Sequence, residues 1–190
     1  MLMSQRQALE ILALQRGHRI VITTMSSTGI WPEFSDTPLD FGYIPSSMGE
    51  GPPLGLGLAL AQPERGVIVV NGDGCMLMNL GTLVTIGSHP ANLFLVVLDN
   101  GIYEITGGQP TAGSGRVDYA GLARAAGIRR VYGFDTYDAW RSGAAQALAG
   151  RGPVFIWLKV EARLGQEAPQ AHRPMADQIQ RLRQALKVST

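Results

Sequence analysis

Two short apolar segments, each followed at once by polar residues, constrain the fold of this chain more than any other feature. Residues 66–71 and 93–98 are rich in valine, leucine and isoleucine, which is typical of buried parallel strands. Gly72-Asp73-Gly74 follows the first segment, and Asn100 follows the second. The carboxyl ends of parallel strands meet at one edge of a sheet, where open α/β sheets bind ligands. We therefore expect Asp73 and Asn100 to lie close together at a binding site.

The chemistry of these residues suits a metal ion with a bound phosphate. Asp73 and Asn100 both offer side-chain oxygens, which a hard cation such as Mg²⁺ prefers. Gly72 and Gly74 allow the backbone to approach a phosphate closely. A helix predicted to begin at Cys75 would direct its N-terminus at the anion. Gly-Asp-Gly is also common in ordinary turns, so the motif alone leaves that alternative open.

Predicted strands and helices alternate along the chain, which indicates an α/β fold with a parallel sheet covered by helices. Strands are predicted at residues 19–24, 66–71, 93–98, 129–134 and 154–160. Helices are predicted at residues 4–16, 75–88, 118–126, 136–149 and 174–187. A capping box of Ser4 and Gln7 opens the first helix, and Asp118 is predicted to cap the helix at 118–126. Residues 51–61 fit either a strand, by their alternation, or a helix bounded by prolines.

Two stretches show neither pattern and are predicted as loops, residues 25–41 and 101–116. Long loops in compact domains are often functional, and Thr24, Ser26 and Ser27 at the start of the first one are also ordinary turn and cap residues. Two helices carry an apolar face that we expect to pack on the core. The residues of these faces are Met76, Leu80, Leu83 and Val84 in the first helix, and Ile179, Leu182 and Leu186 in the second.

Composition excludes several classes of protein. The 190 residues are most simply one domain with a substantial core, and the net charge of +1 gives no footprint for nucleic acid or an anionic membrane. Only 16% of the residues are charged, which fits a surface covered by a partner. Cys75 is the only cysteine, so disulfides within the chain and cysteine-based metal clusters are excluded. We expect a cytoplasmic protein, because residues 1–16 have no signal-peptide core and no apolar run reaches membrane-spanning length.

Three further motifs accompany the pair of strand ends. They are Ser47-Met48-Gly49, the LGLGLALA run at residues 54–61, and the TGGQPT run at residues 106–111. Together with Gly72-Asp73-Gly74 and Asn100, they resemble the thiamine diphosphate-dependent decarboxylases. The similarity is greatest to the β subunit of sulfopyruvate decarboxylase and the matching part of phosphonopyruvate decarboxylase, and it extends from about Ile20 to Val160.

The resemblance implies a three-layer thiamine diphosphate-binding fold, with residues 51–61 as a helix. It implies a diphosphate-binding domain at residues 1–163, followed by a C-terminal arm and helix at 164–190. It also implies that Mg²⁺ is bound by the side chains of Asp73 and Asn100 and by the backbone carbonyl of Ile102.

The resemblance assigns the cofactor to neighbouring residues. Gly72, Gly74 and Cys75 would contact the diphosphate, and Tyr103 would lie against the cofactor. Met48 would hold the cofactor in its bent shape, although a methionine at this position is also compatible with ordinary core packing. Cys75 lies at a predicted helix N-terminus, which can lower the pKa of a thiol. The simpler interpretation is a small residue tolerated beside the diphosphate.

One catalytic group of the resembled family is not expected in this chain. The glutamate that protonates the pyrimidine ring belongs to a second, pyrimidine-binding domain, and Glu50, Glu64 and Glu104 are not in the context to replace it. The expectation is therefore a cofactor-binding subunit that works on a 2-oxo acid only with an α-type, pyrimidine-binding subunit. The assembly would be a hetero-oligomer of α2β2 form or larger.

Two departures from the family pattern bear on the substrate. Glu50 and Ile105 replace small residues near the reactive end of the cofactor, and Glu50 would repel a sulfonate or phosphonate if it pointed inward. Three other functions stay open. They are the β subunit of a 2-oxoacid:ferredoxin oxidoreductase, an acetolactate synthase-like carboligase, and a non-catalytic module that keeps the cofactor fold. His18, His89 and His172 show no metal-binding spacing and are expected at the surface.

Overall fold

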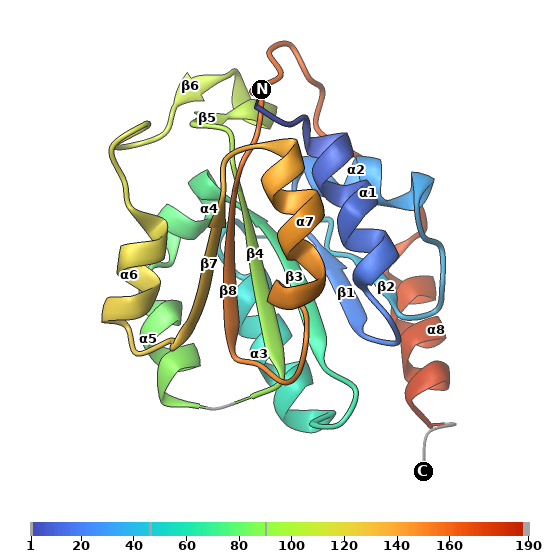
Figure 1. Cartoon of the computed structure of the whole chain (residues 1–190). Helices are drawn as coiled ribbons and strands as arrows, with labels where there is room; N and C mark the ends of the chain where they lie inside the picture. Colours follow the sequence, from blue (N-terminus) through green and yellow to red (C-terminus); the bar gives the residue numbers. More distant parts are fainter. Residues whose placement is uncertain (1, 46, 90, 188–190) are drawn as a thin grey trace.

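The computed structural model describes residues 2–45, 47–89 and 91–187. Its centre is a six-stranded parallel sheet with the order β2-β1-β3-β4-β8-β7 (Figure 1). The strands are β1 (Ile20–Thr23), β2 (Asp40–Gly42), β3 (Val67–Gly72), β4 (Leu93–Asp99), β7 (Arg130–Phe134) and β8 (Val154–Lys159). The predicted α/β fold with a parallel sheet is confirmed.

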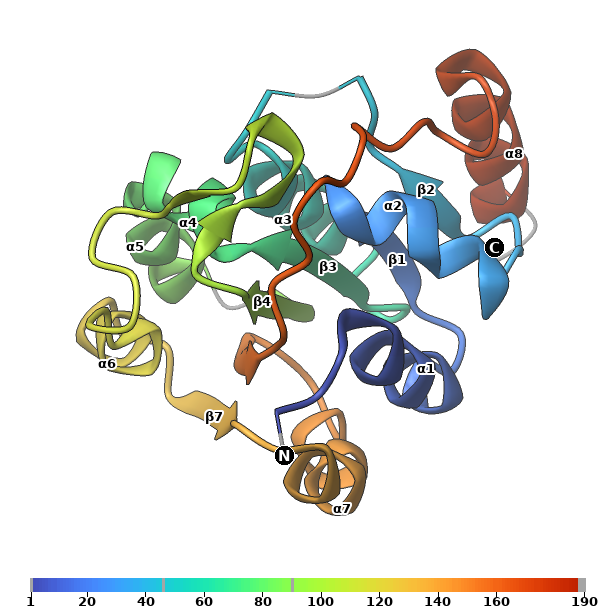
Figure 2. The same ribbon diagram turned by 90° about the horizontal axis from the view of Figure 1, so that it is seen from above.

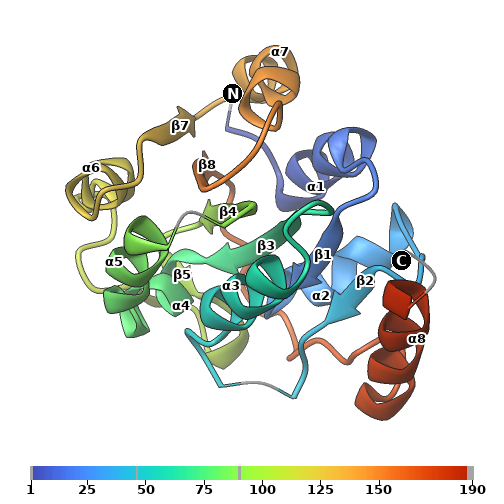
Figure 3. The ribbon, with the colours of Figure 1, turned by 90° about the horizontal axis from the view of Figure 1, so that it is seen from below.

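Helices cover both faces of this sheet (Figures 2 and 3). One face carries α1 (Gln5–Gln15) and α7 (Tyr137–Ala147), and the other carries α3 (Gly51–Ala61), α5 (Gly81–Ser88) and α6 (Tyr119–Ala125). Successive strand residues enter opposite cores: Ile68 and Val70 pack with α1 and α7, whereas Val67 and Val69 pack with α3 and α5. Because both faces are buried, the strands are continuous apolar runs rather than alternating ones.

Side-chain caps hold the starts of three helices. Ser4 Oγ accepts from the backbone N–H of Gln7, and the Gln7 side chain accepts from the backbone N–H of Ser4, so the predicted capping box is confirmed. Asp118 caps α6 as predicted, and Thr136 caps α7. Each such cap typically contributes about 1 kcal/mol to stability.

Both stretches that were predicted as loops contain short elements. Residues 25–41 include α2 (Ser26–Ile30), a 3-10 turn (Trp31–Glu33) and the start of β2. Residues 101–116 include a small antiparallel hairpin of β5 (Ile102–Tyr103) and β6 (Gln109–Pro110), joined through a 3-10 turn (Glu104–Thr106). These elements are too short to show a periodicity in sequence, and β2 exists because it pairs with β1.

The single helix predicted at residues 75–88 is wrong. The chain forms α4 (Asp73–Met78) and then α5, with a break at Asn79, whose side-chain amide donates to a carbonyl in the loop before α3. Because of this break, the side chains of α5 point in other directions than they would in one continuous helix. Met76 and Leu83 are buried as predicted, but Val84 is 58% exposed.

The C-terminal helix α8 (Met175–Lys187) covers the outer edge of β2. The Gln178 side chain accepts from the backbone N–H of Gly42 at 2.7 Å and donates to the carbonyl of the same residue at 3.2 Å. Leu182 is buried as predicted, but Ile179 is 42% exposed, and the polar Gln178 takes the buried place beside it. No helix in the described part of the chain has the length and apolar character needed to cross a bilayer.

Candidate functional site

The predicted site lies where β3 and β4 end, at the upper edge of the sheet in Figure 1. Gly72 pairs with Leu98 across these strands, so Asp73 and Asn100 follow neighbouring strand ends. A pocket that is open to solvent lies beside them. All eight residues predicted to bind the cofactor line it, namely Met48, Gly72, Asp73, Gly74, Cys75, Asn100, Ile102 and Tyr103. Tertiary structure brings them together from three separate segments of the chain, while their binding roles stay predictions.

Asp73 is a buried carboxylate at the base of this pocket. Its pKa is raised to about 6, by burial first and by the nearby charge of Asp99 second, while hydrogen bonds from Thr111 and from the backbone of Gly74 and Asn100 oppose the rise. Among the described residues, no cation forms an ion pair with Asp73. Two neighbouring carboxylates, one of them buried, repel each other, and a bound cation would relieve this repulsion.

The loop after β4 presents the other two predicted metal ligands. The Asn100 side-chain oxygen accepts from the backbone N–H of Ile102 at 3.0 Å, which folds the loop back on itself. Gly101 between them has a φ of +73°, and a Cβ atom there would come within 2.6 Å of Ser114 Oγ, so only glycine fits. Within the described residues, no cluster of three or more histidine, cysteine or acidic side chains forms an alternative metal site.

The two glycines that flank Asp73 have different roles. A Cβ atom at Gly72 would meet nothing within 4 Å, so the backbone there borders open space. A Cβ atom at Gly74 would lie 2.7 Å from the ring of Tyr103. Gly74 is therefore required by the close approach of the loop after β4, and Gly72 leaves the strand end accessible to a ligand.

Asn71 supplies an unused donor beside the same strand end. Its side chain is buried, its oxygen accepts from Thr24 Oγ1 at 3.2 Å, and its amide nitrogen has no partner. Asn71 lines a smaller cavity together with Gly72 and Asn100. A buried donor without an acceptor is costly, and a phosphate oxygen would satisfy it. The residues present therefore fit a divalent cation with a bound diphosphate.

Cys75 does not have the properties of a reactive thiol. It is only 2% exposed, and burial raises the pKa of its thiol above the ordinary value. The lower pKa considered from its place near a helix start is therefore wrong, because desolvation outweighs the nearby backbone N–H groups.

The three polar residues after β1 are only partly available to a ligand. The single hydroxyl proton of Thr24 is shared between two acceptors, the carbonyl of Val70 and the side-chain oxygen of Asn71. The hydroxyl of Ser27 donates to the carbonyl of Thr24. Ser26 lines the pocket beside Asp73, so it is the member of this group best placed for a polar contact.

The two residues that depart from the family pattern lie differently. Ile105 lines the pocket, but Glu50 does not; Glu50 is exposed and accepts from the Asn79 side chain at 3.4 Å. The condition under which Glu50 would repel an anionic substrate, an inward orientation, is not met in this chain.

Sequence reasoning missed three buried or charged residues at the site. Thr111 donates to Asp73 at 2.9 Å, and Asp99 raises the pKa of Asp73 while accepting from the indole N–H of Trp157 at 2.9 Å. Glu104 is 5% exposed and lines the pocket. Thr111 ends a motif singled out above, but nothing in the sequence distinguishes Glu104 from a surface glutamate.

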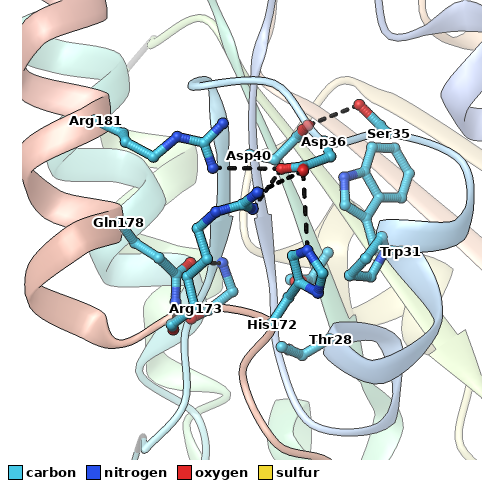
Figure 4. A pocket seen from close by; sticks show the side chains of 12 residues that line it. Thr28, Trp31, Ser35, Asp36, Asp40, His172, Arg173, Gln178 and Arg181 are labelled. Carbon is cyan, nitrogen blue, oxygen red and sulfur yellow. Dashed lines mark hydrogen bonds and ion pairs between the residues drawn. The ribbon is translucent and has the colours of Figure 1, made fainter.

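A second pocket lies between the 3-10 turn that begins at Trp31 and the C-terminal helix (Figure 4). Arg173 and Arg181 both pair with Asp36 at its mouth, at 2.5 and 3.3 Å, and His172 lies 3.8 Å from the same carboxylate. None of the residues predicted to bind the cofactor lies here, and these charges serve to hold α8 in place. All three histidines are exposed, as predicted.

Comparison with known families defines the class of this domain. Residues 31–158 match the family described as thiamine pyrophosphate enzyme, C-terminal TPP binding domain. The chain belongs to this family and is a thiamine diphosphate-binding domain. The resemblance found in the sequence is confirmed.

Individual relatives refine this picture. Phosphonopyruvate decarboxylase from Streptomyces viridochromogenes is 41% identical over 148 residues, which are 77% of this chain and 36% of that protein. Sulfopyruvate decarboxylase subunit beta from Methanothermobacter thermautotrophicus is 42% identical over 127 residues, which are 66% of this chain and 64% of that protein. The chain therefore spans only part of each relative. The crystal structure of benzoylformate decarboxylase from Polynucleobacter necessarius matches 87% of this chain and 34% of its own, with a TM-score of 0.71 at 19% identity, which confirms the three-layer fold.

Proposed function

We propose that this chain is the cofactor-binding subunit of a split, thiamine diphosphate-dependent 2-oxo acid decarboxylase. The observation that carries the proposal is the convergence of eight predicted residues on one pocket around the buried Asp73. The names of the two relatives, both decarboxylases of substituted pyruvates, support the reaction type.

In this proposal the metal is Mg²⁺. Asp73, the side chain of Asn100 and the carbonyl of Ile102 hold it. The raised pKa of Asp73 gives a cation an energetic reason to bind there, because the cation replaces a proton. The backbone of residues 72–75 and the amide of Asn71 bind the diphosphate.

The remaining lining residues shape the cofactor. Met48, on the loop before α3, supports the bent form, and Tyr103 packs against Gly74 at the opposite wall. When bound, thiamine diphosphate supplies an electron sink for the departing CO2. The half-buried, largely apolar wall formed by Met48 and Ile105 limits water at that point.

The second half of the active site comes from a partner in this proposal. An α-type, pyrimidine-binding subunit supplies the activating glutamate, and the assembly is a hetero-oligomer of α2β2 form or larger. The relative from Methanothermobacter, named as a β subunit, supports an active site that is shared between two kinds of subunit.

Exposed apolar side chains are available for such a partner. Leu60 on α3, Met78 on α4 and Val84 on α5 are each more than half exposed, and all three helices lie on the same side of the sheet (Figure 3). In this proposal the partner covers these side chains.

The substrate class in this proposal is a 2-oxo acid of the sulfopyruvate or phosphonopyruvate type. Glu50 lies outside the pocket, so it does not repel an anionic substituent. The pocket lining contains no lysine, arginine or histidine. Recognition of a sulfonate or phosphonate would therefore depend on cationic residues of the partner.

The proposal is tested with the purified chain and a pyrimidine-domain subunit encoded beside it. Calorimetry of the chain alone should detect thiamine diphosphate binding that requires Mg²⁺. CO2 release from sulfopyruvate, phosphonopyruvate or pyruvate should stay at background for the chain alone and appear on mixing. Robust turnover by the chain alone, or cofactor binding without metal, would refute the proposal.

A further inference from the structure

A buried carboxylate lies in the wall of the pocket. Glu104 is 5% exposed and lies two positions after Ile102 in the loop that carries the predicted metal ligands. Its Oε2 accepts from the side-chain amide of Gln5 at 2.9 Å, and its Oε1 accepts from the backbone N–H of Arg163 at 3.0 Å. Among the described residues, no cation pairs with it.

The two donors come from parts of the fold that are far apart in sequence. Gln5 is the first residue of α1 and is itself 2% exposed, and Arg163 follows the end of β8. Gln5 lies on a helix that packs on the sheet, and the segment of Arg163 is joined to the N-terminal segment by the bond from the Glu161 N–H to the Met3 carbonyl. Glu104 therefore connects the loop after β4 to two segments that do not belong to the loop.

The opposite side of the loop is connected to the metal site itself. Thr111 donates from its hydroxyl to Asp73 and from its backbone N–H to the carbonyl of Gly101. Ile102 lies between this connection and Glu104 along the chain. The position of the Ile102 carbonyl therefore depends on both ends of the loop segment, one held by Asp73 and one held by Glu104.

A carboxylate at position 104 matches this arrangement, because both of its oxygens accept from donors. An apolar side chain there would leave both donors without an acceptor. A glutamine can keep both bonds, since it accepts from Arg163 while the amide of Gln5 turns over and accepts from the new NH2 group. The bond to position 5 is lost when both positions carry a carboxylate.

We propose that Glu104 is a positioning residue that sets the geometry of the loop ligands Asn100 and Ile102 through its hydrogen bonds to Gln5 and Arg163. It acts through the loop and touches neither metal nor substrate. The inference rests on the proposed function, because it concerns the same metal–cofactor site.

The test exchanges the two hydrogen-bonding partners. Gln5→Glu should weaken Mg²⁺-dependent binding of thiamine diphosphate about tenfold in calorimetry, because two carboxylates then face each other. Glu104→Leu should weaken it similarly, because both donors lose their acceptor. The double variant Gln5→Glu/Glu104→Gln restores both bonds, since the new amide donates to position 5 and accepts from Arg163. Its affinity should return to within about threefold of the wild type.

Gln15→Glu is the matched control, because it makes the same chemical change as Gln5→Glu at an exposed position of α1. It should leave binding unchanged. A purely structural role would lower the melting temperature of the single variants without changing their metal-dependent affinity, and that result would overturn the proposal. Failure of the folded double variant to recover affinity would overturn it as well.

Two further outcomes are separated by design. If Glu104→Leu does not fold, Gln5→Ala removes only one of the two bonds, and its affinity must still fall for the proposal to stand. If the wild-type chain binds no cofactor with Mg²⁺, the proposed function itself fails, which is distinct from a failure of any variant.

Discussion

Asp73 is a buried carboxylate whose raised pKa reflects desolvation first and the charge of Asp99 second. The same environment that makes its ionised form costly in the metal-free chain makes a bound cation favourable. Thr111 and two backbone N–H groups orient the carboxylate without neutralising it. The surroundings of Asp73 therefore make an ionised carboxylate without a cation unfavourable, which supports the proposed metal site.

Replacing Asp73 with asparagine should separate these two effects. Asp73→Asn keeps the shape of the side chain but removes the charge that attracts Mg²⁺. Thiamine diphosphate binding in the presence of Mg²⁺ should fall at least tenfold in calorimetry, with an unchanged circular dichroism spectrum. Wild-type affinity in this variant would remove Asp73 from the metal site.

The pH dependence of stability follows from the same pKa. The pKa of Asp73 is about 6 when folded, compared with about 3.9 in an unfolded chain, so the folded state holds a proton that the unfolded state releases between these values. Stability of the metal-free chain should therefore fall as pH rises from about 4 to about 6, by roughly 2–3 kcal/mol, and then level off.

Denaturant unfolding in EDTA, with Asp73→Asn as the non-titrating reference, measures this contribution. As pH rises from about 4 to about 6, the free energy of unfolding of the wild-type chain should fall relative to that of the variant. A difference that is independent of pH would contradict the assignment.

Met48 offers a test of cofactor geometry. Met48→Leu conserves volume and should keep most activity of the assembled enzyme. Met48→Ala should lower kcat, because misplacement by about 1 Å can cost on the order of a hundredfold. Metal and diphosphate binding should persist in calorimetry. An unchanged kcat in Met48→Ala would show that Met48 is ordinary packing at the pocket wall.

At the scale of elements, the sheet edge at β2 is closed by a side chain rather than by another strand. The amide of Gln178 satisfies both backbone groups of Gly42 and also donates to the carbonyl of Arg173 at 2.8 Å. Asp36 adds ion pairs to Arg173 and Arg181 at the same junction (Figure 4). An edge strand covered in this way is protected from pairing with other chains.

Gln178→Ala should therefore destabilise the chain by about 1–3 kcal/mol, because it leaves buried backbone groups of β2 unpaired. Urea unfolding provides the measurement. Gln184→Ala, at an exposed position of the same helix, is the control and should change stability by less than about 0.5 kcal/mol. Equal effects of the two substitutions would show that Gln178 does not hold the helix.

At the scale of the whole molecule, the two faces differ in what they expose. Leu60, Met78 and Val84 lie on the side of α3, α4 and α5, whereas the opposite side exposes Leu14 on α1. The proposed partner would cover the first group. The division into a cofactor domain at residues 1–163 and an arm at 164–190 stays a proposal.

A charge on the proposed partner face should prevent assembly. Val84→Lys should reduce association with the pyrimidine-domain subunit at least tenfold, while circular dichroism and binding of thiamine diphosphate by the chain stay unchanged. Leu14→Lys is the matched control, since Leu14 is 79% exposed on the other face. Loss of association in both variants, or in neither, would place the interface elsewhere. Size-exclusion chromatography of the mixed subunits provides the readout.

The sequence by itself determined the parallel sheet and the two strand ends that carry the proposed cofactor site. Long apolar strands flanked by glycine and polar residues carry their own signal, because burial on both faces demands continuous apolar runs. The motif around Asp73 and Asn100 could be recognised for the same reason, since each group follows directly on such a strand.

Only the tertiary structure decided the rest, because those features depend on contacts between distant segments. The break at Asn79 depends on a carbonyl about thirty residues earlier, and it moved Val84 from the predicted core to the surface. The raised pKa of Asp73 depends on burial and on Asp99, and the role of Glu104 depends on Gln5, 99 positions away. Local propensity carries no information about such contacts, since they exist only after the chain has folded.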